Sequence, residues 1–151
     1  MTNIREKAIQ GLQVGDCFCV ERRFTEQDVV QFARISRDYN PVHFEKRFAQ
    51  VKNFEDKICH GLLVGSLLTE IGGQIGWLAT KMDFEFKKPV YFGDYIRCDL
   101  TIVDIRENCQ AKAEAVFTNQ DKVVVLKAEL FGFLPGEREK VVMQDMLNKG
   151  G

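Results

Sequence analysis

The longest apolar segment of the chain covers residues 61–75. Its hydrophobic residues lie on nearly every side of a helical projection, which is typical of a helix buried inside a protein. Thr69 and Glu70 interrupt the segment, and the uninterrupted apolar part is too short to cross a bilayer. The pattern therefore predicts a buried central helix and no membrane span.

Elsewhere the pattern changes to alternation with a period of two residues, as in half-buried β-strands. Ala111, Ala113, Ala115 and Phe117, for example, would share one face of a strand. One buried helix followed by a series of strands is the element order of an α+β protein with an antiparallel sheet. The predicted strands cover residues 18–23, 82–91, 95–106, 110–118 and 123–134.

A second helix is predicted directly after the first strand. Thr25 is placed as its N-cap, with Asp28 three residues later in the capping-box position. Val29, Phe32 and Ala33 then follow at helical spacing. Residues 37–53 are predicted to form a loop with a short helical turn at 46–50.

Composition restricts the class of protein. The chain has 151 residues, of which 45% are apolar and 28% charged, and this composition is typical of a soluble globular domain. Its net charge of −1 predicts no nucleic-acid or membrane partner. The N-terminus lacks the apolar core of a signal peptide. The five cysteines show no metal-ligand spacing, so we expect no metal, and reduced cysteines fit a cytoplasmic location. Cys59-His60 is either a nucleophile–base pair or, more simply, a buried small side chain beside a histidine.

The segment of residues 36–43 combines an acid and a potential base. Asp38 and His43 are separated by Asn40-Pro41, and proline restricts both its own backbone and that of the residue before it. We therefore expect a rigid turn that presents both side chains, followed later by His60-Gly61 at the start of the apolar helix. A carboxylate, an imidazole and a helix N-terminus together can move protons around a carbonyl compound. By itself, the turn is more simply explained as an Asx-type turn with a surface histidine.

The residues 32–43, followed by Phe48-Ala49, resemble the signature of the MaoC-like dehydratases, the hydratase-2 group that includes the (R)-specific enoyl-CoA hydratases. Residues 24–29, 60–63 and 86–94 resemble further parts of the family in the same order, so the likeness runs from about residue 11 to 134. It implies a hot-dog fold, in which an antiparallel sheet wraps a long helix, and a homodimer. Residues 1–136 would form this single domain and residues 137–151 a C-terminal tail, helical or disordered.

The resemblance also implies an activity. The protein would add water reversibly to a trans-2-enoyl thioester of coenzyme A or acyl carrier protein, without cofactor or metal. Asp38 and His43 would hold and activate the water, and the backbone N–H of Gly61 would stabilise the developing enolate oxygen. Independently of any family, a glycine at a helix N-terminus offers an unpaired N–H and allows close approach of a ligand.

Four further residues receive supporting roles at the substrate site. Asn40 would fix the turn, and His60 would brace the start of the helix. Thr69 falls where the family carries a small hydroxyl residue near the acid, although a threonine inside a helix often bonds its own backbone. Gly72 lies on a stripe of small residues that either accommodates the acyl chain or allows close approach of the sheet or a partner; the sequence leaves both explanations open.

Three features depart from the family pattern or add to it. Arg37 stands where the signature often has glycine, and Glu70 places a carboxylate on an apolar helix. Four basic residues are candidates for contact with the phosphates of coenzyme A, or are simply solvated: Lys46, Arg47, Lys87 and Lys88.

Two alternatives keep the thioester ligand. A hot-dog thioesterase would hydrolyse it, but such enzymes place their carboxylate differently from the Asp38/His43 turn. A non-catalytic subunit would only bind it, and would need neither side chain. An assay with an enoyl thioester distinguishes the three functions. Loss of conjugation without free thiol indicates a hydratase, release of free thiol indicates a thioesterase, and neither result favours a subunit that only binds.

Overall fold

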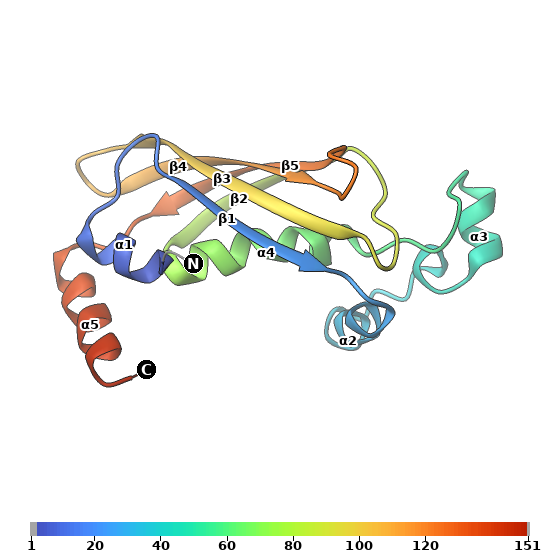
Figure 1. Ribbon diagram of the computed structural model, residues 1–151, viewed down its shortest axis with the longest axis horizontal. Coiled ribbons are helices and arrows are strands. Elements are labelled where there is room, and N and C mark those ends of the chain that lie inside the picture. Colours follow the sequence, from blue (N-terminus) through green and yellow to red (C-terminus); the bar gives the residue numbers. More distant parts are fainter. Residues whose placement is uncertain (1–2, 151) are drawn as a thin grey trace.

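Helix α4 (Gly61–Ile75) lies under a curved five-stranded antiparallel sheet in the computed structural model, which describes residues 3–150. Figure 1 shows the sheet arching over this helix. The strand order is β1-β3-β4-β5-β2. This arrangement confirms the predicted α+β hot-dog fold. The strands are β1 (Cys17–Arg23), β2 (Leu78–Phe86), β3 (Tyr95–Ile105), β4 (Gln110–Thr118) and β5 (Val124–Phe133).

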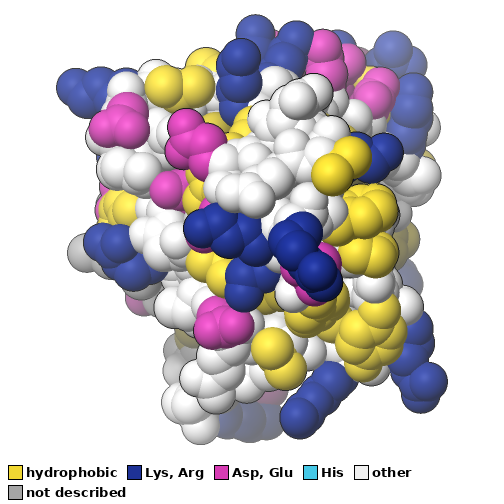
Figure 2. Space-filling view, turned by 90° about the vertical axis from the view of Figure 1, so that its right-hand side faces the viewer, with side chains coloured by type: hydrophobic (Ala, Val, Ile, Leu, Met, Phe, Trp, Pro, Cys, Tyr) yellow, Lys and Arg dark blue, Asp and Glu magenta, His cyan; other side chains and the backbone are white. Residues whose placement is uncertain are grey.

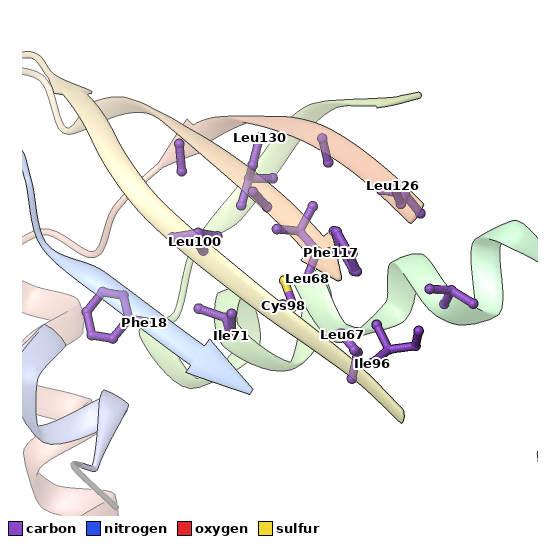
Figure 3. Close-up of a cluster of buried hydrophobic side chains, with 14 of the residues drawn as sticks. Phe18, Leu67, Leu68, Ile71, Ile96, Cys98, Leu100, Phe117, Leu126 and Leu130 are labelled. Atoms are coloured by element: carbon purple, nitrogen blue, oxygen red, sulfur yellow. The ribbon is translucent and has the colours of Figure 1, made fainter. Parts of the chain in front are cut away.

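The hydrophobic core fills the space between α4 and the concave face of the sheet (Figure 3). Leu67, Leu68 and Ile71 of α4 are fully buried. Alternate residues of the strands meet them, because successive strand residues point to opposite faces. The labelled partners in the sheet are Phe18, Ile96, Cys98, Leu100, Phe117, Leu126 and Leu130.

Strand β2 forms one edge of the sheet and differs from its prediction. It begins at Leu78, four residues earlier than predicted, because α4 ends at Gly76 in a left-handed conformation and the chain turns at once. It also ends earlier, at Phe86. The N–H groups of Lys87 and Lys88 both donate to Val125 O, at 2.8 and 3.1 Å, so the regular ladder stops there.

An arm made of α2 (Glu26–Ser36), the 3-10 turn η1 (Pro41–His43) and α3 (Lys46–Val51) extends beyond one end of the sheet (Figure 1). Helix α2 begins with the predicted capping box, in which the Thr25 hydroxyl accepts from Asp28 N and the Asp28 carboxylate accepts from Thr25 N. Helix α3 extends the predicted turn at 46–50 by one residue. The arm therefore follows its local sequence signals.

Two terminal helices cover the opposite end of α4 (Figure 1). Helix α1 (Ile4–Gln10) was not predicted; its Arg5 guanidinium donates to Gly73 O and Gln74 O, at 2.9 and 3.1 Å, which caps the last turn of α4. Helix α5 (Glu137–Asn148) occupies most of the expected tail, and its buried Met143 packs against Gly76. None of the helices among residues 3–150 is long and apolar enough to cross a membrane.

Candidate active site

A chain of short-range hydrogen bonds shapes the turn that carries Asp38. The Ser36 hydroxyl accepts from Asp38 N, Asp38 Oδ1 accepts from Asn40 N, and Asn40 Oδ1 accepts from Val42 N, each at 3.1 Å. Side chains of Ser, Asp and Asn favour this pattern of bonding to the backbone two residues on. Because only Oδ1 of Asp38 is used, Oδ2 remains available.

His43 is held in one tautomer by a backbone carbonyl. Its Nδ1 lies 2.7 Å from Ile58 O, and a carbonyl oxygen can only accept, so Nδ1 carries the proton. Nε2 is then an unprotonated base, 3.8 Å from Asp38 Oδ2. Two acceptors at this separation do not hydrogen-bond each other, but both can accept from one water molecule between them. The turn therefore presents a site for a doubly bonded water.

Burial makes the imidazole of His43 a neutral base. The side chain is almost fully buried, and this desolvation lowers the pKa of His43 below its ordinary value. The hydrogen bond to Ile58 O opposes the shift, the nearby His60 supports it, and the Asp38 carboxylate opposes it. The net lowering keeps Nε2 free to accept a proton at neutral pH.

His60 ties the turn to the start of α4. Its Nε2 lies 2.9 Å from the backbone oxygen of Asp38, so Nε2 carries the proton and donates it there. The ring packs against that of His43, with centroids 3.8 Å apart and the ring planes tilted by 30°. Its Nδ1 is buried without a hydrogen-bond partner among the described residues. The contact agrees with the bracing role expected for His60, which stays a prediction until it is tested.

The N-terminus of α4 faces the same region. The N–H groups of its first turn have no partners within the helix, and no side chain among residues 3–150 caps this end. A Cβ atom on Gly61 would overlap the ring of Phe86, and one on Gly65 would press on the ring of Phe84. Glycine is thus required at position 61 for packing against β2, as well as being suited to close approach of a ligand.

A pocket of about 580 Å³ opens between the arm, the start of α4 and the end of β2. Its lining is mainly apolar, with few polar groups, as is common for small-molecule sites. One lining thiol, Cys59, has its pKa raised by burial to about 12, so it stays protonated and is no nucleophile. The lining residues are Phe32, Ser36, Asp38, His43, Phe54, Ile58, Cys59, His60, Gly61, Leu62, Val64, Phe86, Lys87, Lys88, Pro89, Val90 and Leu126.

The structure brings together four of the seven residues that the sequence assigned to the site. Asp38, His43, His60 and Gly61 all line the pocket. Asn40 does not; it caps η1 and shapes the turn, as its predicted structural role requires.

The remaining two, Thr69 and Gly72, lie outside the pocket lining. Of the two roles that the sequence left open for Thr69, the structure has the local one, since its hydroxyl donates to Ser66 O, at 2.6 Å, within its own helix. Gly72 is buried, and a Cβ atom there would lie 4.0 Å from the side chains of Leu130 and Trp77, which favours packing over a path for the acyl chain. Glu70 is half-exposed and pairs with Arg22.

Sequence reasoning assigned no role to Phe54, Leu62, Phe86 or Leu126, which form much of the apolar wall. Phe86 belongs to a recognised motif, but its contact with Gly61 spans 25 positions and has no local signal. Asp38, His43 and His60 also place one donor atom each within 4.8 Å of one another, close enough to be considered for a metal. We assign them no metal, since the chemistry below needs the first two as free bases.

Comparison with known proteins gives the same result as the geometry. The sequence model of the family described as "MaoC like domain" matches residues 17–124. The chain belongs to this family. A mitochondrial 3-hydroxyacyl-[acyl-carrier-protein] dehydratase of Arabidopsis thaliana is 31% identical over 130 residues, covering 82% of this chain and 78% of that protein.

Two further similarities extend to Aeromonas caviae. Its (R)-specific enoyl-CoA hydratase is 34% identical over 103 residues, or 66% of this chain and 77% of that protein. The solved structure of an (R)-hydratase from A. caviae involved in PHA biosynthesis superimposes with a TM-score of 0.78 at 30% identity, covering 83% of this chain and 99% of the other. This chain is therefore a MaoC-like hot-dog domain with additional residues outside the shared part.

Proposed function

We propose that this protein is an (R)-specific enoyl-CoA hydratase, acting in reverse as a 3-hydroxyacyl thioester dehydratase, and hence a hydro-lyase. One observation carries the proposal: Asp38 Oδ2 and His43 Nε2 face each other across 3.8 Å in an apolar pocket that also contains the uncapped start of α4. The activities in the names of the relatives support the same reaction class.

We infer the steps of the reaction from the positions of these groups. A water held by Asp38 and His43 attacks the β-carbon of the enoyl thioester and transfers one proton to His43 Nε2 as its C–O bond forms. The negative charge that develops on the thioester oxygen is stabilised by the Gly61 N–H and the positive end of the α4 dipole. The proton then returns from the Asp38/His43 pair to the α-carbon. The net change is addition of H and OH across the double bond.

The test uses crotonyl-CoA and purified protein. Ultraviolet absorbance of the conjugated thioester should fall without release of free thiol, and chiral chromatography should show (R)-3-hydroxybutyryl product. Thiol release would instead indicate a thioesterase. No reaction with any enoyl thioester would indicate a subunit that only binds, and either result would overturn the proposal.

We further propose that the protein acts as a homodimer joined through β2. This edge strand is exposed along nearly its whole length, and an unpaired edge is a site for pairing with another chain. On the face of the strand that meets α4, Met82 and Phe86 are 38% and 56% exposed, and Leu62 of α4 is 60% exposed. Antiparallel pairing of two β2 strands would cover these residues with their copies. Sedimentation showing a monomer at micromolar concentration would contradict this.

The carrier and the compartment remain predictions. The relatives include coenzyme A and acyl-carrier-protein enzymes, and proteins named as mitochondrial. We retain the proposal of a cytoplasmic protein, which fractionation of cells would test.

A further inference from the structure

Of the four basic residues considered for contact with the carrier, two are engaged elsewhere. Lys46 pairs with Asp56, at 3.9 Å, and Arg47 forms a salt bridge with Glu45, at 2.9 Å. Neither lines the pocket. Their charges are neutralised by neighbours on the arm or the segment after it, so they are poor candidates for an anion at the pocket.

Lys87 and Lys88 do line the pocket. Their backbone is fixed, since both N–H groups donate to Val125 O and Pro89 follows directly. Only the flexible side chains are free to move, so both ammonium groups stay within reach of the pocket rim. Figure 2 views the end of the molecule that carries the arm, and shows Lys and Arg side chains gathered in the middle of this face beside hydrophobic ones.

The two lysines differ in their partners. Lys87 forms an ion pair with Glu85, whereas Lys88 has no ion pair or side-chain hydrogen bond within residues 3–150. An exposed, unpaired ammonium group on a fixed backbone at a pocket rim is suited to bind a phosphate as a compact point charge. The free positive charge at the pocket is therefore that of Lys88.

Charge also gives the pocket a direction. Among the described residues of the lining, Asp38 is the one carboxylate, and the two lysines are the only Lys or Arg side chains. A thioester whose carrier bears a phosphate would be repelled at the Asp38 end and attracted at the lysine end. The lining thus favours one orientation, with the carrier at the lysines and the thioester near Asp38 and Gly61.

We propose that Lys88, with Lys87 beside it, binds the phosphate of the phosphopantetheine arm, the anion shared by coenzyme A and acyl-carrier-protein thioesters. The inference rests on the proposed function, because it requires an enoyl thioester in the pocket. It adds an anion subsite that recognises the carrier rather than the acyl group.

The experiment compares three crotonyl thioesters: crotonyl-pantetheine, crotonyl-4′-phosphopantetheine and crotonyl-CoA. For each enzyme variant, kcat/KM is measured with all three substrates. The values for crotonyl-4′-phosphopantetheine and for crotonyl-CoA are each divided by the value for crotonyl-pantetheine, and this ratio is compared between variants. Lys88→Ala should lower this ratio by roughly fivefold, the upper range for an exposed ion pair. Lys88→Glu should lower it further, by repulsion. The loss should appear mainly in KM and shrink at high salt.

Lys46→Ala is the matched control, since Lys46 is a nearby lysine that does not line the pocket and should leave the ratio unchanged. Glu85→Gln, which releases Lys87 from its ion pair, should raise the ratio.

Three results would overturn the inference. They are an unchanged ratio in both Lys88 variants, an equal loss in Lys46→Ala, and a loss with crotonyl-CoA but not with crotonyl-4′-phosphopantetheine, which would place the contact at the adenosine phosphates. Failure of the wild-type protein to hydrate any of the three thioesters would instead reject the proposed function, so the two failures are distinguishable.

Discussion

Helix α4 under the sheet and the arm that carries Asp38 and His43 are stabilised by different interactions. Around α4, large apolar side chains such as Leu67 and Ile71 are fully buried, and burial of this kind supplies most of the folding free energy. In the arm, the turn at residues 36–43 is largely exposed and is shaped by hydrogen bonds between near neighbours. Three hydrogen bonds fasten it to distant backbone: from His43 to Ile58 O, from His60 to Asp38 O and from Ile58 N to Val42 O.

The core around α4 therefore provides the stability of the protein, and the turn that carries Asp38 and His43 provides its proposed catalytic groups. Within residues 3–150, the core around α4 holds no acid or base apart from thiols that burial keeps protonated, and the turn at residues 36–43 buries only Val42 and His43. Substitutions of exposed residues in this turn should therefore change the rate with little effect on unfolding, and substitutions in the core should do the reverse. Five experiments test this division.

The largest effect is expected for the proton-transfer pair. Asp38→Asn and His43→Ala should each lower kcat for crotonyl-CoA by about a hundredfold or more, because each removes an acid–base contribution of that size. The double variant should be little worse than the worse single one, since the pair acts as a unit. Glu45→Gln, an exposed carboxylate on the same arm, is the control. A single variant with near-wild-type activity would refute the assignment.

A core substitution should give the opposite result. Ile71→Ala removes a fully buried side chain of α4 and should lower the free energy of unfolding by about 2–5 kcal/mol, with little change in kcat of the folded protein. Denaturant titration measures the first and the crotonyl-CoA assay the second. Ile35→Ala, at a position that is 85% exposed on the arm, should change stability by less than about 0.5 kcal/mol.

Gly72→Leu distinguishes a packing role from an acyl path along α4. The sequence allowed the expectation that leucine here preserves crotonyl-CoA hydration but shortens the usable acyl chain. A Cβ atom at this position would already lie 4.0 Å from Leu130 and Trp77, so the remaining atoms of leucine should overpack the core and cost about 1–3 kcal/mol, with equal effects on all chain lengths. Thermal melts and a panel of enoyl-CoA lengths measure both. Gly73→Leu, with open space around it, is the control. A stable variant with selective loss on long chains would restore the acyl path.

The pH dependence reports on His43. Burial lowers the pKa of His43, and the neutral imidazole is the active base, so activity is present above this pKa and lost as the pH falls through it. The fall in kcat/KM should lie below the ordinary histidine pKa of about 6.5 and approach about tenfold per pH unit. A profile whose acid limb lies above that value would show that burial does not control this group.

The smallest effect concerns the entry to the turn. Arg37 ends α2 with φ of 61°, a left-handed conformation that favours glycine, the residue often found here in the family. Arg37→Gly should therefore stabilise the protein by up to about 1 kcal/mol without changing kcat. Arg34→Gly, inside the same helix, should destabilise it by about 1 kcal/mol. A loss of stability in Arg37→Gly would show that its side chain makes a compensating contact.

Much of the fold could be predicted from the sequence because its signals are local. The apolar segment of α4, the capping box at Thr25 and the alternation along β3, β4 and β5 each depend on residues a few positions apart, and their predicted bounds lie within about one residue of the observed ones. The turn at Asp38 was predictable for the same reason, since Ser36, Asp38 and Asn40 each bond the backbone two residues ahead.

Only the tertiary structure decided how these pieces meet. Two contacts join positions that are far apart in the chain: His60 donates to Asp38 O, and the ring of Phe86 packs against Gly61. The tertiary structure also keeps Thr69 and Gly72 out of the pocket lining. Helix α1 has too few residues to be stable alone and forms where Arg5 can cap α4. Local patterns specify elements and turns, whereas contacts between distant side chains depend on where folding places whole elements.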